Sequence, residues 1–292
     1  MAQETLEYTV VADHPLRVGE NPLWDEQAEM LYYVGVYEGR IYRHDPSDAS
    51  TEVLHSFDQQ IGAVTLTADG SLLCFTDRGT VRRWREGAGI VETLVEPGSV
   101  TEARFNDVVT DPEGRVFCGT KGVDDAPGTL YRLDTDASLI PLVNGIQLSN
   151  GLGFSPDLET LYYAESRDWR IHAFDYDQST GELSNRRTFA AFDHDGGFPD
   201  GLTVDADGDV WTALAYGGQL ARLAPDGSEV ARYETPGSFP TSVAFGGPDL
   251  RDLYVTTGGG DDRAEFGEHA GATLRCRPGV TGRAPFRARI SA

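Results

Sequence analysis

The chain repeats one strand-rich unit six times. Each copy has a short polar element, an apolar stretch, a turn rich in Asp, Gly and Pro, and a second apolar stretch, and the copies start near residues 20, 61, 104, 149, 199 and 240. Repeats of about 40 to 50 residues that consist of strands are typical of β-propellers, in which each repeat forms one blade of four antiparallel strands. We therefore predict an all-β, six-bladed β-propeller, with residues 1–292 forming a single domain.

The outer strands of the blades are also visible as patterns. Residues 129–133 and 170–174 alternate apolar and polar side chains, as half-buried third strands do, and residues 89–94 fit a fourth strand. The last copy has no clear fourth strand of its own, but residues 6–11 form a strand-like stretch before the first copy. We predict that this N-terminal strand completes the last blade, because closing the ring leaves no open sheet edge. A β-sandwich with coincidental turns is the alternative, and six aligned copies argue against it.

The charge of the chain is strongly acidic. It carries 47 acidic residues against 24 basic ones, for a formal net charge of -23, and Lys121 is its only lysine. Nucleic acid is not an expected partner, because phosphate binding needs a basic surface. The acidic residues are spread along the chain rather than gathered in runs, which suits a cytoplasm of high ionic strength, where salt screens their repulsion. We predict a halophilic protein; an ordinary acidic enzyme is the alternative.

No segment predicts secretion or a membrane span. No apolar stretch follows Met1, and no apolar run is long enough to cross a bilayer. Cys74, Cys118 and Cys276 are odd in number and widely spaced, so they form no zinc-type pair and fit a reducing compartment. We expect a cytoplasmic protein without a membrane partner, as a monomer or a weak homo-oligomer.

The repeat also brings polar residues from distant parts of the chain together. In a propeller the first strand of each blade lines the central channel, so equivalent residues form a ring. The equivalent residues are Glu20, Ala63, Asn106, Asn150, Asp200 and Thr241. Hard divalent cations prefer carboxylate and amide oxygens, so we predict a site for one divalent cation, with charge from Glu20 and Asp200 and a neutral oxygen from Asn150. The alternative, that these residues only form turns or cap strands, is weakened because four occur at equivalent positions.

Arg104 is a candidate substrate anchor. It lies two residues before Asn106, which places both side chains on the same side of a strand. A guanidinium group beside a cation site can hold substrate oxygens, although an ion pair with a neighbouring acid is an equal alternative. Other chemistries lack their motifs: the histidines form no metal-type pair, no Gly-x-Ser-x-Gly elbow is present, and the glycine-rich stretch 257–260 has no phosphate-binding lysine.

Three motifs resemble a known family. The sequences RFND at 104–107, SNGL at 149–152 and PDGL at 199–202, together with the segments around Glu20 and Thr241, are similar to those of the SMP-30/gluconolactonase/LRE family, which includes regucalcin and bacterial sugar lactonases. The resemblance covers essentially the whole chain and implies a six-bladed propeller.

The resemblance also implies roles for individual residues. Glu20, Asn150 and Asp200 match the metal ligands of the family, and Asp200 also matches the general base. Arg104 and Asn106 match residues that contact the substrate. Asp124 stands where a family glutamate touches the sugar, in a loop that begins with Lys121 where the family often has methionine. This loop is expected to select the sugar.

The implied activity is metal-dependent hydrolysis of a sugar lactone. The substrate class is an aldonolactone of the gluconolactone, xylonolactone or arabinonolactone type, and the product is the aldonic acid. The cofactor is one divalent cation, and calcium, zinc, magnesium, manganese and ferrous iron all remain open because oxygen ligands accept each of them. Two alternatives are a metal-dependent esterase or organophosphate hydrolase of a related propeller type, and a non-catalytic calcium- or sugar-binding protein similar to regucalcin.

Overall fold

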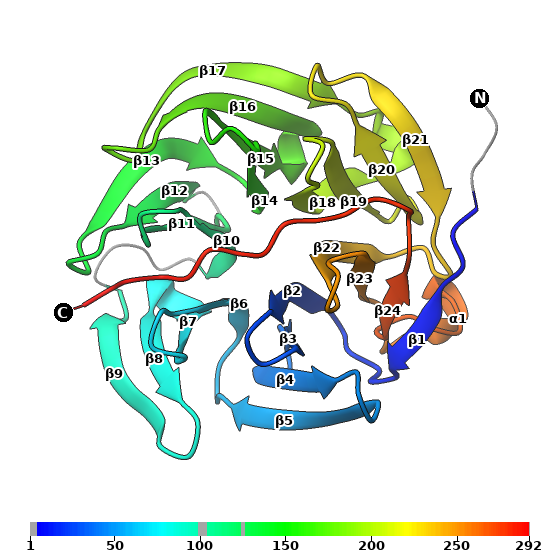
Figure 1. The fold of residues 1–292 in the computed structure, drawn as a ribbon, viewed down its shortest axis with the longest axis horizontal. Helices are drawn as coiled ribbons and strands as arrows, with labels where there is room; N and C mark the ends of the chain where they lie inside the picture. The colour runs from blue at the N-terminus through cyan, green and yellow to red at the C-terminus, as the bar shows by residue number, and fades with distance from the viewer. Residues whose placement is uncertain (1–4, 99–103, 124–125, 292) are drawn as a thin grey trace.

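The structure is a closed ring of six antiparallel sheets. The computed structural model describes residues 5–98, 104–123 and 126–291, and within them each sheet has four strands (Figure 1). The predicted six-bladed β-propeller is therefore confirmed. Each blade begins within one residue of the predicted position.

The strands of the six blades follow one order from the channel outward. The innermost strands are β2 (Gly19–Asp25), β6 (Ile61–Leu66), β10 (Phe105–Thr110), β14 (Ser149–Phe154), β18 (Phe198–Val204) and β22 (Pro240–Gly246). The second strands are β3 (Met30–Gly35), β7 (Leu72–Thr76), β11 (Val116–Thr120), β15 (Thr160–Glu165), β19 (Val210–Ala215) and β23 (Asp252–Thr257). The third strands are β4 (Arg40–Asp45), β8 (Val81–Arg85), β12 (Gly128–Leu133), β16 (Arg170–Asp177), β20 (Gln219–Leu223) and β24 (Thr273–Cys276). The outer strands are β5 (Ser50–Ser56), β9 (Gly89–Val95), β13 (Leu139–Ile146), β17 (Glu182–Ala191), β21 (Glu229–Glu234) and β1 (Thr9–Ala12).

Short helices occupy a few turns. They are η1 (Asp77–Gly79), η2 (Ser166–Asp168), η3 (His194–Gly196) and α1 (Arg263–Phe266). No helix in the described part of the chain is long and apolar enough to cross a membrane.

The N-terminal strand closes the ring, as predicted. Strand β1 pairs antiparallel with β24, with Val10 opposite Leu274, and becomes the outer strand of the last blade. Pairing begins at Thr9 rather than at the predicted residue 6. Leu6 and Tyr8 make residues 6–8 look like part of the strand because they are apolar. They pack against the core between the last two blades but form no strand pairing with β24.

The core consists of layers between neighbouring blades. Six clusters of buried apolar side chains are present in the described residues, one at each junction between blades. At the junction that closes the ring, Trp24 of β2 stacks on Tyr254 of β23 with their ring centroids 5.9 Å apart. Because both faces of a blade are covered, strands such as β6 and β7 are buried along their whole length. This layered burial positions the inner strands around the channel.

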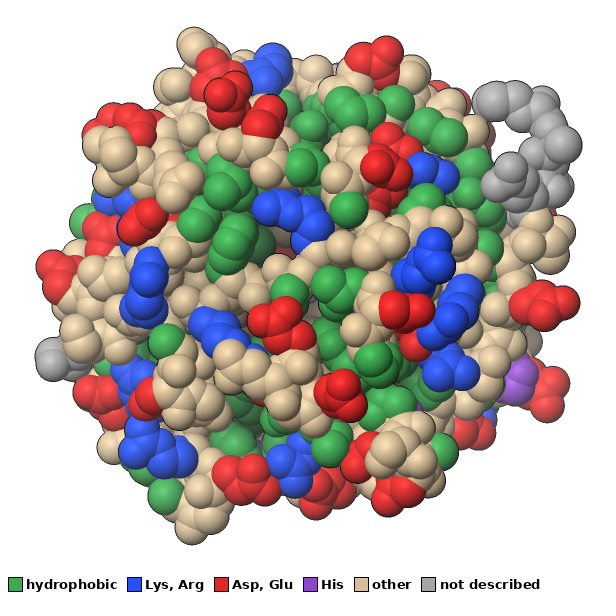
Figure 2. Space-filling view, viewed as in Figure 1, with side chains coloured by type: hydrophobic (Ala, Val, Ile, Leu, Met, Phe, Trp, Pro, Cys, Tyr) green, Lys and Arg blue, Asp and Glu red, His purple; other side chains and the backbone are tan. Residues whose placement is uncertain are grey.

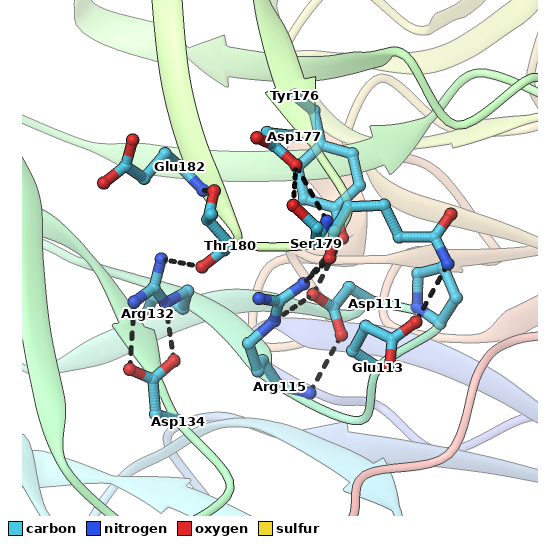
Figure 3. Close-up of polar contacts among 12 residues, drawn as sticks. Asp111, Glu113, Arg115, Arg132, Asp134, Tyr176, Asp177, Ser179, Thr180 and Glu182 are labelled. Atoms are coloured by element: carbon cyan, nitrogen blue, oxygen red, sulfur yellow. Dashed lines mark hydrogen bonds and ion pairs between the residues drawn. The ribbon is translucent and has the colours of Figure 1, made fainter.

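Buried polar groups also connect blades. Asp111, at the end of β10, has a fully buried side chain whose carboxylate accepts hydrogen bonds from Arg115 Nε (2.6 Å) and from Tyr176 Oη (2.8 Å). Tyr176 lies in β16 of the next blade, so the two blades meet at this carboxylate (Figure 3). A buried charge is stable only when it is paired and hydrogen-bonded, which Asp111 satisfies.

The C-terminal segment after β24 crosses one end of the channel. Residues 277–291, which we call the C-terminal strap, run across the ring in front of the inner strands (Figure 1). The strap contacts every blade through Asp25, Leu66, Gly114, Ser155, Ala206 and Leu250. A cavity of about 150 Å³ separates the inner strands from strap residues 283–286. The strap therefore covers this end of the channel.

The surface reflects the acidic composition. On the face crossed by the strap, Asp and Glu side chains are spread around the rim and across the surface, with basic side chains between some of them (Figure 2).

Candidate functional site

The innermost strand of every blade carries an irregularity at the predicted ring of residues. The pairing register with the second strand shifts within each of the six strands; in β2, for example, it shifts between Glu20 and Leu23. Such bulges disrupt the ladder and redirect side chains. The ring residues lie at the beginning of their strands, so they share the channel end that faces away from the strap.

Asn106 and Asn150 are in direct contact. Asn106 Nδ2 donates hydrogen bonds to Asn150 Oδ1 and to the Ser149 carbonyl oxygen (2.7 Å). Asn150 Nδ2 donates to Ser166 Oγ (2.6 Å), and the Ser166 hydroxyl donates to the Pro199 carbonyl oxygen (2.7 Å). Because the Ser166 proton is already used, Asn150 must present its NH2 group to Ser166 and its Oδ1 to the channel. The amide orientation of Asn150 is therefore determined by three blades.

Glu20 and Asp200 are buried carboxylates at the same level. Each of the two residues is only 5% exposed to solvent. Burial, followed by the charges of Asp200 and Asp107, raises the pKa of the Glu20 carboxyl well above its usual range. Burial and then the charge of Asp107 raise the pKa of Asp200, and Arg104 partly offsets this effect. The carboxyl groups therefore repel one another in a site that lacks enough positive charge.

The donor atoms fit a hard divalent cation. Carboxylate oxygens of Glu20 and Asp200 and the amide Oδ1 of Asn150 are the ligand types that such cations prefer, and a cation would offset the repulsion between the acids. In the described residues, no group of three His, Cys, Asp or Glu side chains is arranged to hold a metal. An ion here must therefore use amide oxygens as well as carboxylates.

Arg104 lies directly before β10 and faces the same site. Its Nη1 donates to the Phe105 carbonyl oxygen (3.2 Å), and it pairs with none of the carboxylates that the structure describes. Burial lowers the pKa of Arg104, and the charge of Glu20 counteracts this effect. The alternative of a simple ion pair is therefore not realised among the described residues, and the guanidinium keeps donors for a ligand.

The glycines that follow two site residues lie in strands rather than turns. A Cβ atom on Gly151 would lie 2.2 Å from the Leu202 nitrogen, and one on Gly201 would lie 1.9 Å from Ser242 Oγ. Only glycine permits this close approach of neighbouring inner strands. The Asn-Gly and Asp-Gly pairs thus serve the packing of the ring, and they bring Asn150 and Asp200 close together.

Two site residues were not found from the sequence. Asp107 is buried beside Asn106, and burial raises the pKa of its carboxyl to about 7. Strict alternation would place Asp107 on the opposite side from Asn106, but the bulge in β10 brings both side chains into the interior. Ser166 acts through Asn150 of its own blade and the Pro199 carbonyl oxygen of the next, a connection that no local pattern reveals. Asp124 lies outside the described residues, so its predicted role is untested.

The fold and the site define a class of protein: a six-bladed propeller with buried carboxylate and amide groups at one end of its channel and a strap across the other. The chain belongs to the SMP-30/gluconolactonase/LRE-like family, whose model matches residues 18–259.

Relatives extend over the full length of the chain. It is 41% identical over 294 residues to the pentonolactonase XacC of Haloferax volcanii, covering 97% of this chain and 98% of that protein. It is 34% identical to regucalcin of Xenopus laevis, covering 85% of each chain. Among solved structures, a calcium-binding regucalcin from Agrobacterium tumefaciens superposes with a TM-score of 0.89 at 25% identity, covering all of both chains.

Proposed function

We propose that this protein is a metal-dependent sugar lactonase that hydrolyses an aldonolactone to the aldonic acid. The observation that carries the proposal is the meeting of Glu20, Asn106, Asn150 and Asp200 at one end of the channel. Full-length similarity to a pentonolactonase supports the same activity and makes a five-carbon lactone of the xylonolactone or arabinonolactone type one candidate substrate. Similarity to a haloarchaeal protein also accords with the acidic, halophilic composition.

Glu20, Asn150 and Asp200 are the proposed metal ligands. The two carboxylates supply charge, and the Ser166 contact directs the Asn150 oxygen toward them. When bound, the cation polarises the lactone carbonyl and stabilises the negative charge that develops on its oxygen. Few protein ligands leave positions open for water and substrate.

The remaining site residues position the substrate and move a proton. Both N–H groups of the Asn106 amide are used within the protein, so its Oδ1 is free to accept a hydrogen bond from a sugar hydroxyl. Arg104 donates to hydroxyl or carbonyl oxygens. Asp200 accepts a proton from the attacking water as the water oxygen bonds to the carbonyl carbon. The bond between this carbon and the ring oxygen then breaks, and the ring oxygen takes up the proton that Asp200 accepted, which regenerates the carboxylate.

The first experiment tests the dependence of turnover on the cation. Protein freed of metal by a chelator is assayed for acid release from xylono-, arabinono- and gluconolactone at high salt, alone and with calcium, magnesium, manganese, zinc or ferrous iron. We expect chelation to abolish hydrolysis and at least one cation to restore it. Tight binding of calcium without hydrolysis of any lactone would instead identify a binding protein similar to regucalcin.

The second experiment tests the double role of Asp200. The Asp200→Asn variant removes both a charged ligand and the proton acceptor, so we expect turnover to fall by about 10² or more and cation affinity to fall with it. Calorimetric titration of the cation and lactone hydrolysis are measured on the same samples. Asp226→Asn, in an exposed turn where the carboxylate accepts only from Ser228, is the control. Full lactonase activity in Asp200→Asn would refute the assignment.

A further inference from the structure

Six turns surround the mouth of the channel above the proposed metal site. In each blade the start of the innermost strand pairs with the end of the second strand; Glu20, for instance, lies opposite Val34, and Ser149 opposite Glu165. The connections from second to third strands therefore lie on the face of the site, opposite the strap. The connections in blades two, three and four carry the basic residues Arg78, Lys121 and Arg167. Those in blades five, six and one carry the aromatic residues Tyr216, Phe266 and Tyr37.

Two of the basic residues border one groove that adjoins the site. Lys121 and Arg167 line a groove of about 610 Å³ between blades three and four, together with Gly122 and Gln147. The backbone N–H of Lys121 donates to the Arg104 carbonyl oxygen (2.9 Å). This bond places the start of the groove beside Arg104, on the substrate-binding side of the site. Burial and then the positive charges of Arg104 and Arg167 lower the pKa of Lys121. Lys121 is therefore close enough to both guanidinium groups to be repelled by them.

These cations are unusual in a chain of net charge -23. Other arginines in the structure form ion pairs, such as Arg43 with Glu52 of the neighbouring strand and Arg222 with Asp209 in the turn before β19. In the described part of the chain, neither Lys121 nor Arg167 pairs with a carboxylate. Asp168, the one acid of the adjoining helix η2, is already engaged, since it pairs with both Arg170 and His172. An anion in the groove would relieve this repulsion.

The opposite side of the mouth is aromatic. Tyr216 is 55% exposed and stacks on Phe239 with their ring centroids 4.2 Å apart. Burial and then the charge of Asp200 raise the pKa of Tyr216, which places this ring near the proposed proton acceptor. The flat face of Tyr216 offers an apolar surface for the C–H groups of a sugar ring. A lactone at Asp200 thus has an aromatic surface on one side and three cations on the other.

We propose that Lys121 and Arg167, with Arg104, form a subsite for an anionic substituent on the substrate. The substituent is a carboxylate, sulfonate or phosphate on the carbon farthest from the lactone carbonyl. Charge-assisted hydrogen bonds from Lys121 and Arg167 hold it, while the carbonyl carbon lies at Asp200. The inference rests on the proposed lactonase function and specifies its substrate class.

Binding of the open-chain acids tests the subsite without requiring turnover. Calorimetry compares gluconate, 6-phosphogluconate and glucarate, which share a polyol chain but end in a hydroxyl, a phosphate or a second carboxylate. We expect the best anionic ligand to bind about tenfold or more tightly than gluconate, and the Lys121→Gln/Arg167→Gln double variant to lose this preference. Preference for 6-phosphogluconate over glucarate identifies phosphate, and the reverse identifies carboxylate. The matched control is Arg251→Gln, which removes an exposed arginine from the opposite face.

Equal binding of gluconate and both anionic ligands to the native protein would overturn the subsite, as would a preference that survives in the double variant. Hydrolysis then separates the two proposals. If the subsite exists in a lactonase, the double variant lowers kcat/KM for 6-phosphogluconolactone about tenfold or more relative to that for gluconolactone. If the preference in binding is lost in the double variant but no lactone is hydrolysed, the subsite stands and the lactonase proposal alone fails.

Discussion

Ser166 determines the orientation of Asn150 although it lies outside the ring of equivalent residues. Its hydroxyl donates to the Pro199 carbonyl oxygen of the next blade, so it can only accept from Asn150. The Ser166 contact fixes the Asn150 amide at its nitrogen, and Asn106 Nδ2 fixes it at its oxygen. At the residue scale, the proposed cation affinity depends on this second layer of contacts.

Removing the Ser166 hydroxyl should therefore weaken the metal site without touching a proposed ligand. For Ser166→Ala we expect cation affinity to fall roughly 10- to 100-fold, because the Asn150 amide then loses the contact that holds its nitrogen and is positioned by Asn106 alone. Calorimetric titration measures the affinity, and Ser228→Ala in an exposed turn is the control. Unchanged cation affinity in Ser166→Ala would contradict a role for Ser166 in holding the Asn150 oxygen.

At the scale of elements, the blades combine regular outer strands with irregular inner ones. The bulges at the start of the inner strands interrupt the alternation of side chains, which is why Asn106 and Asp107 both enter the interior. Strand β1 solves a different problem, because it supplies the outer strand that the last blade lacks. Blade six is thereby assembled from both ends of the chain.

Loss of strand β1 should destabilise the whole ring. Deleting residues 1–12 exposes the edge of β24 and removes Val10 from the core between the last two blades. We expect Tm to fall, and a synthetic peptide of residues 5–13 to restore part of it, because the peptide can pair with the exposed edge. A scrambled peptide is the control. A deletion variant with native Tm would contradict the role of β1 in closure.

At the scale of the whole molecule, the ring has two different ends. The strap covers one end and contacts all six blades, while the proposed metal site and its mouth lie at the other. We propose that the chain forms one domain that unfolds as a unit, because each core layer joins two neighbouring blades. On this proposal, the face with the strap stabilises the ring, and the opposite face admits the substrate.

Removal of the strap should affect stability more than catalysis. Truncation of residues 281–292 takes Ala288 and Ile290 out of the core between blades two and three and leaves the buried Asp25 without Arg287. We expect Tm to drop by roughly 5–10 °C, with little change in kcat well below Tm. Removal of only residues 291 and 292 is the control. Equal losses of Tm in both variants would contradict the proposal that the strap stabilises the ring by joining its blades.

Salt should stabilise the protein as a whole. The net charge of -23 produces repulsion that added salt screens, so we expect a single thermal transition whose Tm rises between about 0.1 and about 2 M KCl. Calorimetry measures both properties. A Tm that is independent of KCl would contradict the halophilic interpretation, and two separate transitions would contradict a single domain.

The sequence alone predicted the number of blades and the closure of the ring by an N-terminal strand. It also predicted that four residues lie at the same depth in the channel: Glu20, Asn106, Asn150 and Asp200. A repeated pattern places equivalent residues at equivalent depth in a ring, whatever their distance in sequence. The roles of these residues and of Asp124 remain predictions.

Other features depend on contacts that no local pattern contains. Asp107 joins the site because a bulge reverses its direction, and Ser166 matters through a carbonyl group of the next blade. The strap has no strand periodicity, and Lys121, Arg167 and Tyr216 reach the mouth from turns far apart in sequence. Period and polarity are local properties that specify strands, whereas the direction of a side chain at a bulge or turn is set by whichever distant segment packs against it.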